Sequence, residues 1–266
     1  MKNLLVPIDF SEAADNALEY AKLLAIHFDA KLTLVHAHSA PRDPMRIGIA
    51  SEELFAEAES RLRRAAMTLR SIGLRVEEIS RKGAVVATLK AVALKEKADL
   101  IVMGCQGKGY QPGKFMGSTT TTLMDEIDLP IMAVPHNFPP ALPEQFVWAT
   151  DLTPPKSEKV LFPLLRLIGI AKQELKVFHY QEGSREQALN PTLKERLTGV
   201  EYDLFSQSAD GEKPEEAILE FVKMIKADVV TLIHRRVKWF SKLMVGSSTR
   251  KTVWTSPVPI LILQEH

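Results

Sequence analysis

A glycine-rich stretch at residues 104–120, GCQGKGYQPGKFMGSTT, combines the residue types that hold a phosphate. Glycines allow a ligand to approach the backbone with no Cβ in the way. Ser118 and Thr119 offer hydroxyl donors at the start of an expected helix, whose free N–H groups and positive dipole end favour an anion. Lys108 and Lys114 supply positive charge. The alternative is a surface loop followed by helix-capping side chains, and the stretch alone does not decide between them.

Two familiar phosphate-binding motifs do not fit this stretch. A P-loop would need a glycine at Lys108 and a hydroxyl side chain at Phe115. A dinucleotide fingerprint would need a glycine at Pro112, and it would follow the first strand rather than the fourth. Both motifs are therefore excluded.

The rest of the chain predicts elements that would position such a site. Short apolar runs that read as buried strands alternate with amphipathic helical stretches, which is the pattern of a doubly wound parallel sheet. Ser11 is the expected N-cap of the first helix. In the first part of the chain, we expect strands at 3–8, 31–37, 74–80, 99–104 and 130–135, and helices at 11–28, 51–72 and 84–97.

The second part of the chain repeats the order of the first. The segment from residue 99 to 130 aligns with 228 to 259 at a constant offset, and Gly117-Ser118 falls on Gly246-Ser247. A proline-rich segment, HNFPPALPEQ, separates the two parts and has the composition of a linker. We therefore expect an N-terminal domain at 1–137, a linker at about 138–144 and a C-terminal domain at 145–266.

The spacing of Gly104, two residues, Gly107, nine residues and Gly117-Ser118 resembles the nucleotide-binding motif of the universal stress protein family. The opening LVPIDFSE, the strand LVHA and the strand PIMAVP are similar to other family segments in the same order. This resemblance covers essentially the whole chain as a tandem of two family domains. It implies an α/β fold of two tandem Rossmann-like (adenine nucleotide alpha hydrolase-like) domains, each with a five-stranded parallel sheet and flanking helices.

The resemblance also implies a set of nucleotide-binding residues. Asp9 would contact the adenine or ribose side, although capping of the first helix is its alternative role. Ala37 is smaller than the valine usual in the family, and Met103 is equally explained as core. The full implied set is Pro7, Ile8, Asp9, Ala37, Met103, Gly104, Gln106, Gly107, Lys108, Gly117, Ser118 and Thr119.

The implied function is that of an ATP-binding stress-response or regulatory protein, with Mg²⁺ as the ion accompanying ATP. Binding of AMP, a cyclic nucleotide or a lipid and weak ATP hydrolysis are the alternatives. No G-x-S-x-G or H-E-x-x-H motif is present, so we expect no catalytic residues and no enzyme. Cys105 is expected to be an unreactive bystander, and His36 and His179 are expected to be core or rim histidines without a metal.

Composition and net charge limit the kinds of partner that we expect this protein to bind. The 266 residues carry a net charge of +1 and a single cysteine, which argues against nucleic acid and against a disulfide framework. No apolar run approaches the length of a membrane span, so we expect a cytoplasmic protein without a membrane contact.

The two halves are not expected to bind equally. At the same offset, Gly104 corresponds to Ile233 and Gly107 to Arg236, so the second loop lacks the glycines that a ligand requires. We expect one nucleotide per chain, in the N-terminal half. Asp151 and the helix start at Gly246 leave a weak anion site conceivable in the second half, where Arg235, Arg236 and Lys238 could attract an anion. The strands PIMAVP and PILIL are expected to pair the two domains within one chain, and a homodimer is a further expected assembly.

Overall fold

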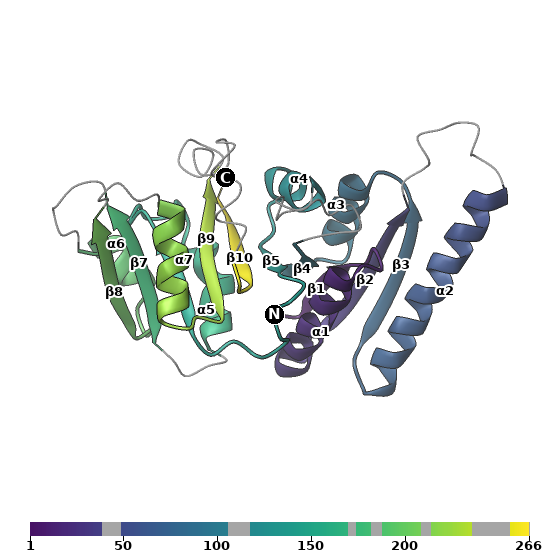
Figure 1. The fold of residues 1–266 in the computed structure, drawn as a ribbon, viewed down its shortest axis with the longest axis horizontal. Coiled ribbons are helices and arrows are strands. Elements are labelled where there is room, and N and C mark those ends of the chain that lie inside the picture. Colours follow the sequence, from purple (N-terminus) through teal and green to yellow (C-terminus); the bar gives the residue numbers. More distant parts are fainter. Residues whose placement is uncertain are drawn as a thin grey trace.

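Ten strands form one twisted sheet in the order β3-β2-β1-β4-β5-β10-β9-β6-β7-β8 (Figure 1). The structure is a computed structural model that describes residues 1–38, 49–105, 118–169, 174–181, 188–208, 214–235 and 256–265. The sheet consists of two groups of five strands with the same order, which is the expected α/β architecture.

The N-terminal group alternates strands and helices along the chain. Its strands pair in parallel, β1 with both β2 and β4, β2 with β3, and β4 with β5. The elements are β1 (Asn3–Pro7), α1 (Glu12–Phe28), β2 (Lys31–His38), α2 (Ile49–Ser71), β3 (Val76–Lys82), α3 (Val85–Lys95), β4 (Leu100–Gly104), α4 (Ser118–Glu126) and β5 (Ile131–Val134). The predicted helices agree closely with these bounds, whereas the third strand begins and ends two residues later than expected.

The C-terminal group repeats this arrangement, and its first two α-helices are shorter than those of the N-terminal group. Strand β6 pairs in parallel with β7 and β9, β7 with β8, and β9 with β10. The elements are β6 (Phe146–Thr150), the 3₁₀ turn η2 (Glu158–Leu161), α5 (Phe162–Ile168), β7 (Leu175–Gln181), α6 (Pro191–Arg196), β8 (Tyr202–Ser208), α7 (Pro214–Met224), β9 (Val229–Arg235) and β10 (Ile260–Glu265).

The two groups meet where β5 runs antiparallel to β10 (Figure 1). Ile260 lies opposite Ala133, and Leu261 lies opposite Met132. Every residue of both strands is buried, so the junction lies inside the sheet and not at a solvent-exposed edge.

Local sequence determines where the first helix, α1, begins and ends and which of its faces is buried. Ser11 caps α1, because its Oγ accepts a hydrogen bond from the Ala14 amide at 3.2 Å. The helix ends at Asp29, which adopts a left-handed conformation with φ of 48°. Its buried stripe consists mainly of alanines, which lets α1 pack close to the sheet; the stripe is Ala13, Ala14, Ala17, Tyr20, Ala21, Leu24 and Ala25.

A carboxylate clamp occurs once in each half at the start of its first strand. Asp99 Oδ2 accepts hydrogen bonds from the backbone amides of residues 2 and 3, at 2.5 and 3.0 Å. Asp228 Oδ2 accepts the same pair of bonds from residues 144 and 145, at 2.9 and 2.8 Å. The two halves therefore share this backbone contact as well as their sequence repeat.

The backbone also repeats its unusual conformations. Phe10 and Leu152 both have positive φ, 59° and 58°, in the turn that follows the first strand of each half. Lys97 and Lys226 have φ of 51° and 53° before the fourth strand. Such values are uncommon for residues other than glycine, so their recurrence at matched positions indicates one shared backbone plan.

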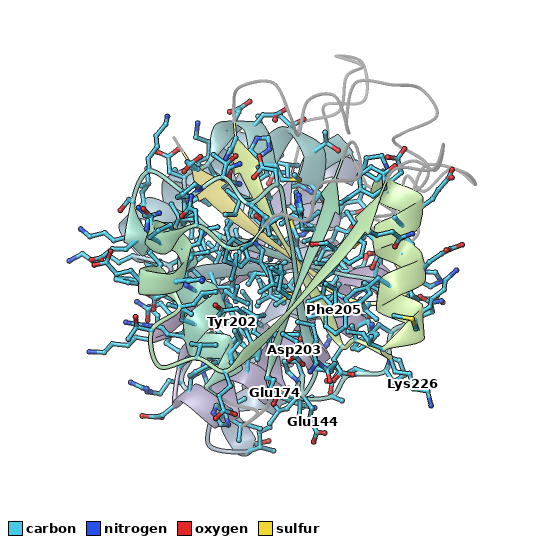
Figure 2. The ribbon with its side chains drawn as sticks, turned by 90° about the vertical axis from the view of Figure 1, so that its left-hand side faces the viewer. Glu144, Glu174, Tyr202, Asp203, Phe205 and Lys226 are labelled. Carbon is cyan, nitrogen blue, oxygen red and sulfur yellow. The ribbon has the colours of Figure 1, made fainter. Side chains whose placement is uncertain are left out.

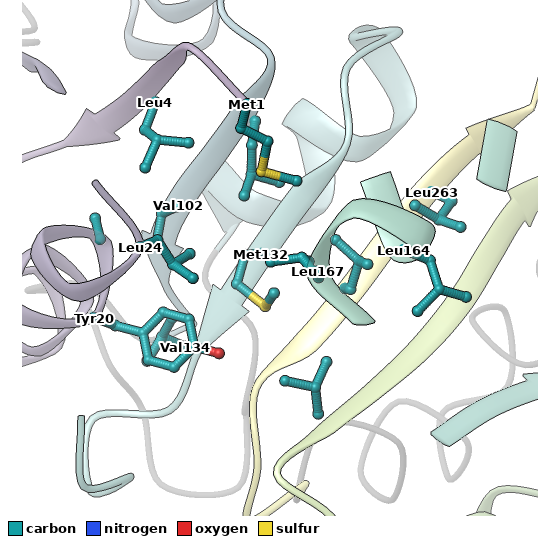
Figure 3. Packing of buried hydrophobic residues seen from close by; sticks show 14 of the residues in the cluster. Met1, Leu4, Tyr20, Leu24, Val102, Met132, Val134, Leu164, Leu167 and Leu263 are labelled. Carbon is teal, nitrogen blue, oxygen red and sulfur yellow. The ribbon is translucent and has the colours of Figure 1, made fainter. Parts of the chain in front are cut away.

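Helices cover both faces of the sheet, and each core layer crosses the junction. On one face, a single cluster of buried side chains includes Tyr20 and Leu24 of α1, Met132 of β5 and Leu164 and Leu167 of α5 (Figure 3). On the other face, a second cluster joins α3 and α4 to α7. No helix among the described residues is both long and apolar enough to cross a bilayer.

The outer strand β8 alternates its side chains between the two faces. Tyr202 packs on one core cluster and Phe205 on the other, as their positions in Figure 2 illustrate. Lys176 Nζ donates to Asp203 Oδ2 at 2.5 Å and to Glu174 Oε2 at 2.9 Å. Charged pairs of this kind discourage pairing with the edge of another sheet.

Candidate functional site

The described candidates gather at the carboxyl ends of three adjacent strands. Pro7 ends β1, Ala37 lies near the end of β2, and Gly104 ends β4, and the sheet order places β1 between the other two. Ligands of open parallel sheets bind at this edge. These candidate residues therefore lie at the edge of the sheet where the sequence predicted them.

Asp9 organises the turn that leads from β1 into α1. Its Oδ1 accepts hydrogen bonds from the Ser11 amide at 3.0 Å and from Ser11 Oγ at 2.5 Å. The alternative role of Asp9 as the helix cap is wrong, because Ser11 is the cap and Asp9 orients its hydroxyl. The Asp9 side chain is half-buried.

Ile8 has its backbone groups committed to the protein. Its amide donates to the Val35 carbonyl at 2.8 Å, and its carbonyl lies 2.7 Å from His36 Nδ1. Because a carbonyl can only accept, His36 Nδ1 must carry a proton. The Ile8 N–H is therefore not available to a nucleobase, and His36 is a rim histidine, as expected.

A glycine is needed at position 104 because the first helix, α1, packs directly against it. A Cβ at this position would lie 2.6 Å from the Ala13 carbonyl oxygen and 2.8 Å from the Ala13 Cβ, both in the first turn of α1. The sequence predicted close approach of a ligand here, whereas the structure places the backbone of α1 against the glycine. Gly104 thus sets how near α1 lies to the end of β4.

Met103 and Cys105, on either side of Gly104, are core residues. Both belong to the cluster that packs against α4, with exposures of 5% and 8%. Met103 therefore follows its alternative role as core. Burial raises the pKa of the Cys105 thiol to about 12, so the thiol remains protonated at neutral pH and is a weak nucleophile.

Helix α4 begins at Ser118, where the expected phosphate cradle ends. Thr119 is half-buried and Thr120 is buried, so the first turn presents one hydroxyl side chain toward the surface and one toward the core. Four predicted site residues lie outside the described residues, namely Gln106, Gly107, Lys108 and Gly117.

Aromatic and cationic side chains near Asp9 were missed by sequence reasoning. The Arg61 guanidinium lies over the Phe10 ring, 4.2 Å from its centroid, and Phe10 lies 4.9 Å from the His36 ring. Arg61 belongs to the charged run of α2. No periodicity in the sequence could have shown that α2 reaches the end of β1.

The corresponding edge of the second half is closed by side chains. Asp151 occupies the turn after β6, where its Oδ1 accepts from the Thr153 amide at 3.0 Å, as Asp9 accepts from Ser11. Arg235 was expected to help attract an anion, and this is wrong: its guanidinium is paired with the Asp151 carboxylate. Among the described residues, no group of three or more His, Cys, Asp or Glu side chains could hold a metal ion.

Comparison with known proteins shows the family. The model of the Universal stress protein family matches residues 1–135 and 167–264. The chain belongs to the universal stress protein family. The unmatched interval contains β6 and the turn at Asp151.

Known relatives are similar to one half at a time, and solved tandem structures to the whole chain. A Thermus aquaticus protein, "Universal stress protein in QAH/OAS sulfhydrylase 3'region", is 32% identical over 140 residues, covering 50% of this chain and 98% of the relative. A Synechocystis universal stress protein is 32% identical over 137 residues, covering 50% of this chain and 85% of the relative. The crystal structure of a universal stress protein from Archaeoglobus fulgidus covers 99% of this chain and 96% of its own, with a TM-score of 0.78 and 20% identity. This last likeness shows the fold of the full ten-stranded chain.

Proposed function

We propose that this universal stress protein binds one adenine nucleotide, ATP, in its N-terminal half. The observation that carries the proposal is that Asp9, Ala37 and Gly104 lie at or beside the carboxyl ends of three adjacent strands, β1, β2 and β4. A helix N-terminus presents free amides to phosphate, and the lysines between Gly104 and Ser118 would add positive charge. Membership in the family supports the same interpretation.

The chain's own residues would act by holding and orienting the nucleotide. Asp9 is fixed by Ser11 at the end of β1, and the half-buried Ala37 lies on the neighbouring strand, where a base could pack. A Mg²⁺ ion accompanying ATP would be held chiefly by phosphate oxygens, as is usual for this metal.

The proposed role is regulatory binding rather than catalysis. A bound nucleotide shifts a protein toward the conformation that binds it better, and this shift can change partner choice. Cys105, the one nucleophilic thiol, is buried and protonated, which supports a role without covalent chemistry.

Isothermal titration of the purified full-length protein tests the proposal. ATP should bind with a stoichiometry close to one per chain. AMP should bind roughly tenfold or more weakly, because it lacks the β- and γ-phosphates, which would accept further charge-assisted hydrogen bonds. Mass spectrometry of ligand extracted from the purified protein identifies any other occupant, and a single-turnover hydrolysis assay measures ATPase activity.

A matched pair of variants locates the site. Gly117→Val should abolish ATP binding by keeping phosphate away from the helix start, whereas Gly246→Val at the equivalent position should leave binding unchanged. Unchanged ATP affinity of Gly117→Val, with a normal circular dichroism spectrum, would contradict the proposed cradle.

A further inference from the structure

The carboxyl edge of the second half holds an ionic cluster made by three adjacent strands. Arg235 is the last residue of β9, Glu265 is the last residue of β10, and Asp151 follows β6 directly. The sheet order β10-β9-β6 places the arginine between the two acids. All three side chains are largely buried, with exposures of 16% for Arg235, 6% for Glu265 and 23% for Asp151.

The guanidinium of Arg235 is bonded through all three of its nitrogens. Nη1 lies 2.7 Å from both Asp151 oxygens, Nε donates to Glu265 Oε2 at 2.7 Å, and Nη2 donates to the Thr153 carbonyl at 2.6 Å. Glu265 Oε1 in turn accepts from the Lys156 amide at 2.5 Å. Arginine suits such a cage because its planar fork presents donors in fixed directions.

The same positions of the first half carry different chemistry. At the offset that relates the halves, Arg235 corresponds to Gln106 and Glu265 to His136, while Asp151 occupies the same turn as Asp9. The first half therefore keeps the turn carboxylate but lacks both the guanidinium and the second acid.

We propose that the second half has become a guanidinium site, with Arg235 of the same chain as its permanent occupant. Asp151 and Glu265 supply the carboxylates that a guanidinium requires, and the loop at residues 153–156 completes the cage. The occupied cage ties the ends of β6, β9 and β10 together without an external ligand.

The filled cage also accounts for the difference between the halves. A nucleotide at this edge would meet two carboxylates and would have to displace a largely buried ion pair. Ile233, on the strand that carries Arg235, is buried in the core where the first half has Gly104. Only this exclusion of nucleotide rests on the function proposed above; the guanidinium cage stands without it.

Chemical rescue of Arg235→Ala in the full-length protein tests the cage. Removing the guanidinium leaves two buried carboxylates unpaired, so the thermal midpoint should fall by roughly 6–12 °C. Millimolar methylguanidinium should restore a large part of this loss by entering the vacated cage. The wild-type protein and Arg63→Ala should show no such gain, because the pair that Arg63 forms with Glu59 at 3.7 Å is exposed to solvent.

Further variants distinguish loss of a specific guanidinium cage from a general loss of stability. Arg235→Lys keeps the charge but not the fork, so it should be intermediate in stability and should not respond to methylguanidinium. In Arg235→Ala combined with Asp151→Asn, the rescue should be weaker. If Arg235→Ala does not fold, Arg235→Gln takes its place in the same titration.

Each result bears on one proposal only. An unchanged midpoint of Arg235→Ala, or a loss that methylguanidinium does not reverse selectively, would overturn the guanidinium site. An ATP stoichiometry near two in the wild-type protein would overturn the exclusion of nucleotide from the second half. Absence of ATP binding to any form would refute the proposed function and leave the rescue result in force.

Discussion

At the scale of single residues, one missing Cβ decides how the candidate site is built. Gly104 lies against the Ala13 carbonyl, so the first turn of α1 reaches the end of β4 only because no side chain intervenes. Asp9, four residues before Ala13, lies just after the end of β1 at the same edge of the sheet and is held by Ser11. The glycine that packing requires at position 104 and the predicted ligand-binding carboxylate of Asp9 therefore lie at the same edge of the sheet.

Gly104→Ala should destabilise the protein by about 1–3 kcal/mol, because the added methyl group overlaps backbone that cannot move independently of α1. Urea denaturation measures the loss. Gly169→Ala is the matched control: its new Cβ would have its nearest neighbour at 3.4 Å, so we expect a change within about 0.5 kcal/mol. Equal stability of Gly104→Ala and the wild type would contradict the close contact.

At the scale of elements, each half fixes the start of its first strand with one carboxylate. Asp99 holds the backbone at residues 2–3, and Asp228 holds it at 144–145. The second clamp receives the chain where it enters β6 after the proline-rich segment. At the other end of that segment, the Asn16 side chain donates to the carbonyls of Pro135 and Phe138, at 2.7 and 2.9 Å. The predicted linker is therefore anchored at both ends.

Asp99→Ala and Asp228→Ala should each lower the free energy of unfolding by about 1–3 kcal/mol, since each leaves two backbone amides without a charged acceptor. Similar losses are expected because the two contacts are equivalent. Glu57→Ala removes a charge from the exposed surface of α2 and should change stability by no more than about 0.5 kcal/mol. A loss confined to one of the two aspartates would show that the clamps are not equivalent.

At the scale of the whole molecule, the two halves share one sheet and both core layers. Met132 and Leu261 lie opposite each other in the antiparallel junction, and both are fully buried. Tyr20 of α1 is buried near Asp228 of the second half; burial, with a smaller contribution from this carboxylate, raises the pKa of the phenol. Separation of the halves would expose two apolar strand edges and this packed surface.

A protease site placed within residues 138–144 should allow the chain to be cut without separating the halves. The fragments should elute together in size-exclusion chromatography at the position of the intact 29.7 kDa chain, because the β5–β10 junction is buried. Leu261→Asp should weaken this association by burying a charge opposite Met132. Elution of the N-terminal fragment as a stable monomer would contradict the expected association.

The amino-acid sequence by itself determined the order of the elements, the internal repeat and the region of the candidate site. Alternating apolar runs and amphipathic stretches are local signals, and the constant offset between the halves is visible in the letters. The cap at Ser11 was predictable for the same reason, since it depends on neighbours within a few residues.

Only the tertiary structure decided which distant groups meet. Gly104 faces α1, Arg61 covers Phe10, and Arg235 lies between Asp151 and Glu265 because strands far apart in the chain end side by side. The partners of Arg235 are 84 and 30 residues away, so no local pattern records them. Burial then selects the pairing, because a charge removed from water must find an opposite charge within hydrogen-bonding distance.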